Sequence, residues 1–404
     1  MLHSLLVEPR GGAGGQGFGP GAVLRLIREA GEITRNDLHA RTGLGRSAVA
    51  QRVDALAALG LLTTGEGAST GGRPPTTLKF NPHAGLVLGA DLGATHSRLA
   101  LADLGGSLLA EVGRDIRIDA GPEAVLGWVG QGFDAMLAEA GRSRAGVRAI
   151  GLGVPGPVEF ATGRPASPPI MPGWDDYPIP EALRETYDVP VLVDNDVNIM
   201  AVGEHWSRWP ERDNLLFIKV GTGIGCGIVA EGDIYRGAQG AAGDIGHIQV
   251  AGHGDVVCEC GNIACLEAIA SGRALARHLR ELGLDAEDSR AVVALVKAQN
   301  TEAVRLVRHA GRLIGEVLAS LVNSVNPAVI VVGGDVAAAD EQLFAGIREV
   351  VYRRSTALAT RHLQIAHSAL DDRAGVIGAA VMAIDHILSP DAIDRELVDH
   401  GIRV

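Results

Sequence analysis

Apolar residues recur at helical spacing in the first part of the chain. Positions 23–27 form one apolar face that stops at Gly31, and Thr34 followed by Asp37 predicts the capped start of a second helix. After a turn at Gly43, apolar residues at intervals of three and four over positions 44–60 predict another helix. Two short helices joined by a glycine-containing turn are typical of a helix-turn-helix.

Two short strands are predicted directly after these helices. Positions 61–64 and 76–80 are rich in Thr and Leu, and a Gly/Ser loop at 65–72 separates them. A hairpin of this kind after a helix-turn-helix indicates a β-wing. We therefore expect a flexible Gly-rich tail at 1–17. Residues 18–83 are expected to form a winged helix-turn-helix domain, in which a β-wing follows the helices.

The pattern changes to alternating strands and helices beyond residue 84. Positions 86–91 and 97–103 predict one strand hairpin, and positions 215–220 and 225–230 predict a second. A long amphipathic helix at 304–325 precedes another strand. Hairpin starts repeated after a helical crossover favour an α/β domain of two similar lobes, the first at about 84–203 plus the C-terminal helix and the second at about 204–372.

Charge divides the chain in the same place. The 404 residues carry a formal charge of −12, which ordinarily counts against nucleic-acid binding. Between positions 18 and 83, however, eight basic residues face five acidic ones, giving +3, so the remainder carries −15. The basic module is therefore a candidate reader of DNA.

In such modules the N-terminal residues of the second helix contact base edges in the major groove. Arg can hold guanine with two hydrogen bonds and Gln can hold adenine, whereas Ser is permissive. A wing Arg suits the adjacent minor groove. The alternative is a small helical packing module with solvated arginines. The candidate DNA contacts are Arg46, Ser47, Gln51, Arg52 and, on the wing, Arg73.

Three glycine-rich turns at strand ends suit a nucleotide phosphate, because glycine lets backbone N–H groups approach oxygen atoms. In the first, a carboxylate precedes the turn and a hydroxyl follows it, which suits a metal–nucleotide phosphate. Taken singly, each is also compatible with an ordinary hairpin turn. The candidate residues are Asp91, Gly93 and Thr95, then Gly221, Thr222 and Gly223, then Gly333 and Gly334.

The run Asp194–Asn198 directly follows a predicted buried strand. Polar groups at the carboxyl end of such a strand are candidates for ligand contact. A carboxylate there can accept the proton of a substrate hydroxyl in phosphoryl transfer. The alternative is a helix cap, a position that Asp and Asn favour.

Three of the four cysteines fall within eight residues, in the spacing Cys258-x-Cys260-x4-Cys265. With His247 they form a set of one imidazole and three thiolates, which is a closed tetrahedral zinc set. The spacing differs from the common C-x2-C pair, and reduced core cysteines are the alternative. Cys226 lies in a predicted strand and is expected to be buried and inert.

The composition places the chain among soluble proteins with reduced thiols. It is 47% hydrophobic, yet it has no run of about 20 apolar residues that would span a membrane. The first ten residues lack the features of a signal peptide. Four cysteines in so long a chain do not make a disulfide scaffold. We therefore expect a cytoplasmic protein.

Together these motifs resemble the ROK family of repressors, open reading frames and sugar kinases. The resemblance extends from about Phe18 to Leu388. The winged module before an Asp-x-Gly-x-Thr hairpin resembles the repressor branch, since the family's kinases start at that hairpin. The most specific segments are 243–247 (Gly-Asp-Ile-Gly-His), 258–265, 155–157 (Pro-Gly-Pro), 171–174 (Met-Pro-Gly-Trp) and 193–198.

The resemblance implies an actin-like, sugar-kinase or ribonuclease H-like fold with a sugar in the cleft between two lobes. It implies that the glycine turns hold ATP, if ATP binds. It also implies that His247 ligates zinc as well as contacting sugar. By this resemblance Asp196 would be the catalytic base of any kinase activity, and the sugar contacts would be Asn195, Asp196, Asp244, His247 and Glu267.

Three positions depart from the family pattern. Asp244 stands where the family has Glu, which shortens the reach by roughly 1.5 Å and changes the sugar contact. Ala264 replaces the Gly before the third Cys, and Ala94 replaces a Gly, so that its methyl group could crowd a phosphate.

Three hypotheses follow from the sequence. The first is a sugar-responsive transcriptional repressor that binds operator DNA as a homo-oligomer, a dimer or a tetramer. The second is an ATP-dependent sugar kinase of hexoses or N-acetylhexosamines, with or without regulation on the same chain. The third is a zinc-stabilised scaffold with an inactive cleft.

Overall fold

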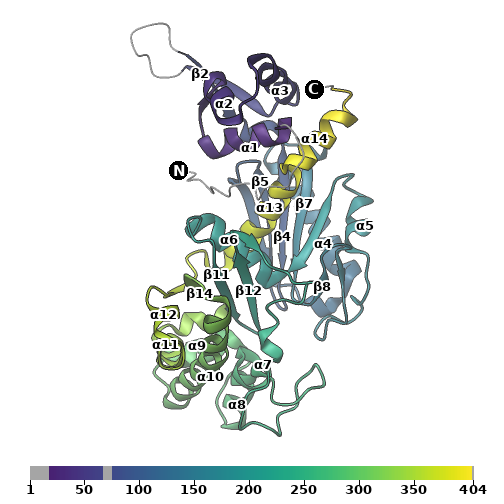
Figure 1. The fold of residues 1–404 in the computed structure, drawn as a ribbon. Coiled ribbons are helices and arrows are strands. Elements are labelled where there is room, and N and C mark those ends of the chain that lie inside the picture. The colour runs from purple at the N-terminus through teal and green to yellow at the C-terminus, as the bar shows by residue number, and fades with distance from the viewer. Residues whose placement is uncertain (1–17, 67–74, 403–404) are drawn as a thin grey trace.

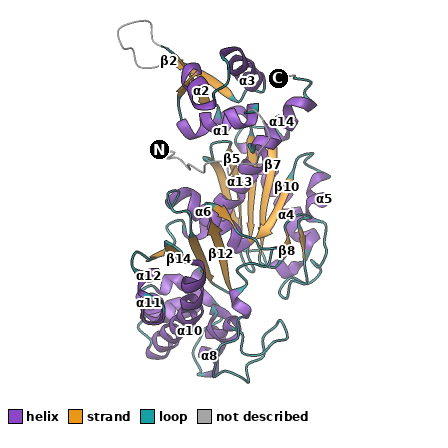
Figure 2. Ribbon diagram, in the orientation of Figure 1, coloured by secondary structure: helices purple, strands orange, loops and turns teal. Residues whose placement is uncertain are grey.

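The computed structural model describes residues 18–66 and 75–402. Its N-terminal unit contains three helices and a three-stranded sheet of order β1-β3-β2 (Figures 1 and 2). Helices and a strand pair lie where the sequence predicts them, and β1 was not predicted. The elements are α1 (Pro20–Ala30), β1 (Ile33–Thr34), α2 (Arg35–Thr42), α3 (Arg46–Ala58), β2 (Leu62–Glu66) and β3 (Thr76–Phe80).

Local hydrogen bonds explain where α2 begins and ends. The Thr34 hydroxyl oxygen accepts from the Asp37 backbone N–H at 3.1 Å, and the Asp37 carboxylate accepts from the Thr34 N–H at 3.2 Å. This is the predicted capping box with Asp in place of Glu. The helix ends at Gly43, whose φ of 70° favours glycine.

The first lobe is built on a sheet of order β10-β7-β4-β5-β6. Strands β4, β5 and β6 form an antiparallel meander, and β7 and β10 add to β4 in parallel. Helices α4 (Pro122–Glu139) and α5 (Ile179–Arg184) belong to this lobe. The strands are β4 (Leu86–Leu92), β5 (Ser97–Asp103), β6 (Leu108–Arg114), β7 (Val147–Val154) and β10 (Val191–Asn195), and a small pair, β8 (Val158–Glu159) and β9 (Arg164–Pro165), lies beside them.

The second lobe repeats this topology, with order β13-β12-β11-β14-β15. Again three antiparallel strands are extended by two parallel ones. The prediction of two similar α/β lobes is thus confirmed, and the architecture is actin-like. The strands are β11 (Leu215–Val220), β12 (Ile224–Ala230), β13 (Asp233–Ile234), β14 (Val329–Gly333) and β15 (Gln364–His367), and the main helices are α8 (Gly272–Glu281), α9 (Ser289–Lys297), α10 (Thr301–Val325), α11 (Glu341–Arg354) and α12 (Ala357–Thr360).

Two helices pack against each other beside the first sheet. They are α6 (Asp196–Arg208) and α13 (Ala374–Ile387), and α13 also packs on β4 and β7. Glycines allow the close approach: a Cβ on Gly378 would lie 1.7 Å from the Ile199 carbonyl oxygen, and one on Gly203 would lie 2.1 Å from that of Ala374. Helix α13 is therefore fixed tightly in the body of the molecule.

The N-terminal unit shares a hydrophobic core with the C-terminal end of the chain. Apolar residues of α1, including Val23 and Ile27, join Ile384, Ile393 and Leu397 in one cluster. The last two lie on α14 (Pro390–Asp399), which follows α13 and contacts α1 (Figure 1).

Among the described helices, none by itself has the length and apolar composition to cross a membrane, although the bent pair 371–387 and 390–399 would meet those criteria together.

Candidate functional site

A cavity of about 550 Å³ lies between the two lobes. Pockets of this size hold small-molecule ligands. Residues from both lobes line the cavity, and they include every residue that the sequence suggested for sugar or nucleotide: Asp91, Gly93, Thr95, Asn195, Asp196, Gly221, Thr222, Gly223, Asp244, His247, Glu267, Gly333 and Gly334. The structure thus brings together residues up to 243 positions apart in the chain.

The glycine turns border the cavity with closely packed backbone. The Gly221 N–H donates to the Gly223 carbonyl oxygen at 3.0 Å, closing a tight hairpin between β11 and β12. Gly334 has a φ of 88°, and a Cβ there would lie 2.7 Å from the Val220 carbonyl oxygen. Side chains are excluded at such points, so that a ligand can approach the backbone closely.

The start of α6 serves as a helix cap and also borders the cavity. The Asn195 side-chain oxygen accepts from the Val197 N–H at 2.9 Å, and its amide nitrogen donates to the Gly156 carbonyl at 2.8 Å. Asp196, only 5% exposed, is the first residue of the helix. Asn195 therefore caps the helix, and both residues border the cavity.

Sequence reasoning missed Lys219, which lies on β11 and lines the same cavity. Its ammonium contacts Oδ2 of Asp196. Burial, followed by the nearby Asp196 carboxylate, raises the pKa of Asp91 to about 7, while Lys219 opposes that shift. The signal available in the sequence was a single charge inside an otherwise apolar strand, Leu215–Val220.

Asp194, at the end of β10, has a structural role. Its Oδ1 accepts from the Asn195 N–H and from the Asn198 side-chain amide, and its Oδ2 lies 2.7 Å from Nε of Arg236. The Arg236 guanidinium also stacks 3.7 Å above the Phe160 ring. Arg236 comes from the second lobe and its partners from the first, so this contact joins the lobes beside the cavity.

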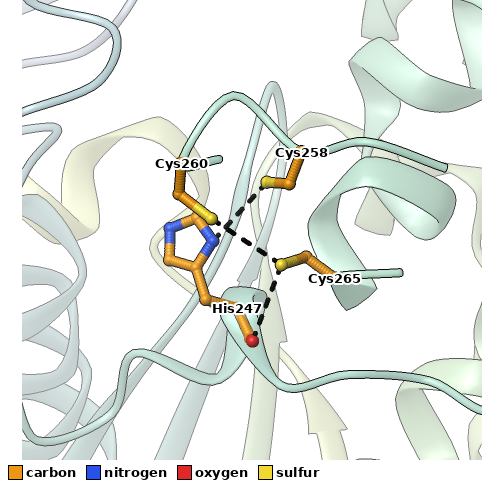
Figure 3. Close-up of side chains that lie close together, drawn as sticks. All are labelled: His247, Cys258, Cys260 and Cys265. Carbon is orange, nitrogen blue, oxygen red and sulfur yellow. Dashed lines mark hydrogen bonds between the residues drawn. The ribbon is translucent and has the colours of Figure 1, made fainter. Parts of the chain in front are cut away.

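The four His/Cys residues lie together (Figure 3), and His247 among them also lines the cavity. Their ligand atoms all lie within 4.8 Å of one another, with 3.8 Å between the Cys260 and Cys265 sulfurs and 3.6 Å from Cys258 Sγ to Nδ1 of His247. Tetrahedral zinc with Zn–S bonds of about 2.3 Å places two sulfurs about 3.8 Å apart. The donor set therefore fits Zn²⁺ in both chemistry and spacing.

The orientation of His247 allows it to face the thiols and the cavity at once. Nδ1 points to Cys258, whereas Nε2 lies 3.9 Å from Oδ1 of Asp244, a half-exposed carboxylate on the cavity wall. Glu267, in the first turn of α7 (Leu266–Ala270), accepts from the Ile224 N–H at 3.0 Å. The Cys loop is thereby joined to the β11–β12 hairpin through α7.

The backbone conformation of Ala264 and the burial of Cys226 agree with what the sequence suggested for these two positions. Ala264 has a φ of 56°, a left-handed conformation that costs an L-residue about 1–2 kcal/mol, which explains the physical advantage of glycine there. Cys226 lies in β12, and burial raises the pKa of its thiol to about 12. A thiol this weakly acidic is unreactive, as expected.

The candidate DNA contacts occupy the start of α3. Arg46, Ser47 and Gln51 are exposed. Arg52 is half-buried, and its guanidinium donates to the Phe18 carbonyl and, at 3.0 Å, to that of Ala48. Arg52 therefore holds the chain segment that leads into α1. The suggested wing residue, Arg73, lies outside the described residues, as does the tail 1–17.

Comparison with known proteins decides the family. The model of the ROK family matches residues 87–386. The chain belongs to the ROK family. The sequence is 30% identical over 382 residues to the xylose repressor of Caldicellulosiruptor bescii, covering 91% of this chain and 95% of the repressor.

Solved structures of ROK proteins show both branches of the family. A ROK family transcriptional regulator, a homologue of the Escherichia coli MLC protein, superposes with a TM-score of 0.81 at 25% identity, covering 94% of this chain and 98% of that one. A ROK glucokinase from Streptomyces griseus, solved with glucose and AMPPNP, gives 0.62 at 29% identity over 74% of this chain and 99% of its own. The regulator match extends over the N-terminal unit as well, whereas the kinase match covers about three quarters of the chain.

Proposed function

We propose that this ROK protein is a sugar-responsive transcriptional repressor of carbohydrate genes, acting in the cytoplasm. The observation that carries the proposal is that one chain combines a basic N-terminal unit, of three helices and a three-stranded sheet, with a cavity lined by carboxylates, amides and an imidazole. The N-terminal unit shares one hydrophobic core with α13, α14 and the first lobe. The similarity to repressors over more than nine tenths of the chain supports the same reading.

The DNA interface would be the exposed start of α3. Arg46 and Gln51 would read base edges in the major groove, with Ser47 beside them. Arg52 would act indirectly by holding the Phe18 segment. A homo-oligomer would place two such helices on a pseudo-palindromic operator. The acidic body would repel DNA and confine the contact to the N-terminal unit.

The sugar would bind where Asp196, Asp244, His247 and Glu267 border the cavity. Carboxylates accept hydrogen bonds from hydroxyl groups, while Nε2 of His247 can donate one when Nδ1 binds a metal. A structural Zn²⁺ would be held by His247, Cys258, Cys260 and Cys265. It would fix the ring orientation of His247 and the loop beside it.

Helix α13 provides a direct route from the cavity to the DNA-binding unit. Asp371 and Asp372, just before its first turn, line the cavity, and its last turn leads into α14 under α1. Sugar binding would change how far the two lobes close. This change would move α13 and, through α14, alter the placement of α3. A useful switch needs a coupling of about 1–3 kcal/mol.

The test is fluorescence anisotropy of the full-length protein with its own upstream DNA, over a range of salt concentrations and with a panel of sugars. We expect salt-sensitive binding that one class of sugar weakens. Absence of salt-sensitive binding to that DNA, compared with a scrambled duplex, contradicts the proposal.

A sugar kinase is the second candidate, and retention of Asp91, Thr95, Asp196 and the glycine turns favours it. ATP and Mg²⁺ would then lie against these turns. The test is ADP release with hexoses and N-acetylhexosamines, with Asp196→Asn as the control. Equal background rates in the two proteins exclude the activity.

A further inference from the structure

Lys219 reaches into the cavity past the second glycine turn. It is one of only three lysines in the chain, whose other 33 basic residues are arginines. Its Cε lies 3.8 Å from the position that a Cβ on Gly221 would occupy, so the side chain runs along the turn. Its ammonium meets Asp196 Oδ2, where the two side chains are 24% and 6% exposed.

The ammonium contacts the Asp196 carboxylate and is attracted by that of Asp91, and both carboxylates come from other parts of the fold. Asp91 comes from β4, Asp196 from α6 and Lys219 from β11 of the second lobe. Burial disfavours the charged lysine, but attraction to Asp196 and Asp91 outweighs it and raises the Lys219 pKa. The lysine is therefore charged at neutral pH, and it offsets the negative charge of the two carboxylates.

Phosphoryl transfer from a nucleotide requires this region to be free for other groups. A divalent cation must neutralise the phosphates, and an unpaired carboxylate must accept the proton of the sugar hydroxyl. Here an ammonium group already occupies Asp196 and supplies positive charge beside Asp91. A second cation in the same place would meet electrostatic repulsion at short range. A magnesium nucleotide would therefore have to displace the ammonium from Asp196.

We propose that Lys219 is an internal counter-ion that contacts Asp196 near Asp91 and takes the place of a divalent cation there, so that the cavity binds an uncharged sugar without a magnesium nucleotide. This inference rests on the proposed sugar-binding function. It assigns Lys219 as the residue that determines ligand class. A lysine can also bind phosphate directly. In that case removal of Lys219 would weaken nucleotide binding, whereas the counter-ion role predicts that it becomes tighter.

The experiment is calorimetric titration of zinc-loaded, full-length protein with a non-hydrolysable ATP analogue and Mg²⁺. Lys219→Met removes the charge and keeps an unbranched stem, while Lys297→Met, at an exposed position on α9, is the matched control. We expect weak or undetectable binding to wild type and Lys297→Met, and binding at least about tenfold tighter to Lys219→Met. Lys219→Gln should give the same gain in affinity for the nucleotide analogue. It replaces Lys219→Met in the experiment if that variant does not fold.

Two results overturn the proposal. Either the Lys219 variants bind the nucleotide no more tightly than wild type, or they lose a binding that wild type shows, which would make Lys219 a phosphate ligand. Stabilisation by a sugar panel without nucleotide is measured on the same samples. If no sugar stabilises the wild type, the proposed sugar-binding function fails, independently of the nucleotide result.

Discussion

The backbone N–H of Gly21 in α1 donates a 2.8 Å hydrogen bond to Oδ1 of Asp394 in α14. The two residues are 373 positions apart. This bond and the apolar cluster around it fasten the N-terminal unit to the last helix of the chain. The contact between the N-terminal unit and the rest of the chain therefore depends on α14, which lies beyond the residues that match the ROK family model.

Gly21→Ala should disrupt this contact. A Cβ there would lie 2.2 Å from the Pro390 carbonyl oxygen, so α1 and α14 must separate. We expect a loss of about 1–3 kcal/mol in the free energy of unfolding, measured by urea denaturation, and a weaker sugar effect on DNA affinity. Gly127→Ala on α4, where nothing lies within 4 Å, is the control and should be stabilising. Equal effects of the two substitutions would contradict the close contact.

Cys260→Ser should remove the metal. Loss of one thiolate opens the tetrahedral set, so bound zinc measured by mass spectrometry should fall from one equivalent to near zero, with a lower Tm. Cys226→Ala removes a cysteine that lies outside the set and should keep the metal. Retention of a full equivalent by Cys260→Ser would show that this thiol is not a ligand.

Arg46→Ala should weaken operator binding by about 1–3 kcal/mol with no change in Tm, since the side chain is exposed at the first position of α3. Binding is measured by anisotropy at several salt concentrations. Arg305→Ala removes the same charge from α10 in the second lobe, far from the N-terminal unit. This variant should bind operator DNA as the wild type does. If the two variants bind equally, α3 does not form the interface.

Asp91→Asn should stabilise the protein in a pH-dependent manner. The unfolded chain loses this proton near pH 4, whereas the folded protein keeps it until about pH 7. Ionisation therefore lowers the free energy of unfolding as the pH rises between these values, and the loss is complete above pH 7. The Tm difference between Asp91→Asn and wild type should grow from pH 5 to pH 8. A constant difference would mean that the first turn of α13, against which Asp91 packs, stabilises the carboxylate instead.

Glu204→Ala should be strongly destabilising. This fully buried carboxylate on α6 accepts hydrogen bonds through Oε1 from the Ser368 hydroxyl and from the N–H groups of Ala369 and Leu370. Its removal leaves three part-buried donors without this acceptor, at up to about 1–3 kcal/mol for each donor. Glu204→Gln keeps an oxygen acceptor, so chemical denaturation should show a smaller loss. A larger loss for Gln than for Ala would contradict this role.

The sequence by itself determined the local structure and the chemical inventory. The Thr34–Asp37 cap, the glycine turns and the spacing of Cys258, Cys260 and Cys265 depend on residues close together in the chain, whose hydrogen bonds and reach are set by covalent geometry. The alternation of hairpins and helices likewise predicted two α/β lobes, because periodicity follows from which side chains must be buried.

Tertiary structure alone decided how these parts act on one another. The pairing of Lys219 with Asp196, the raised pKa of Asp91 and the docking of Asp394 against Gly21 need elements that only folding brings together. A charge in an apolar strand is ambiguous until its neighbours are known, since burial and facing carboxylates set its energy. The contact between α1 and α14 likewise depends on backbone approach within a shared core, which no local pattern encodes.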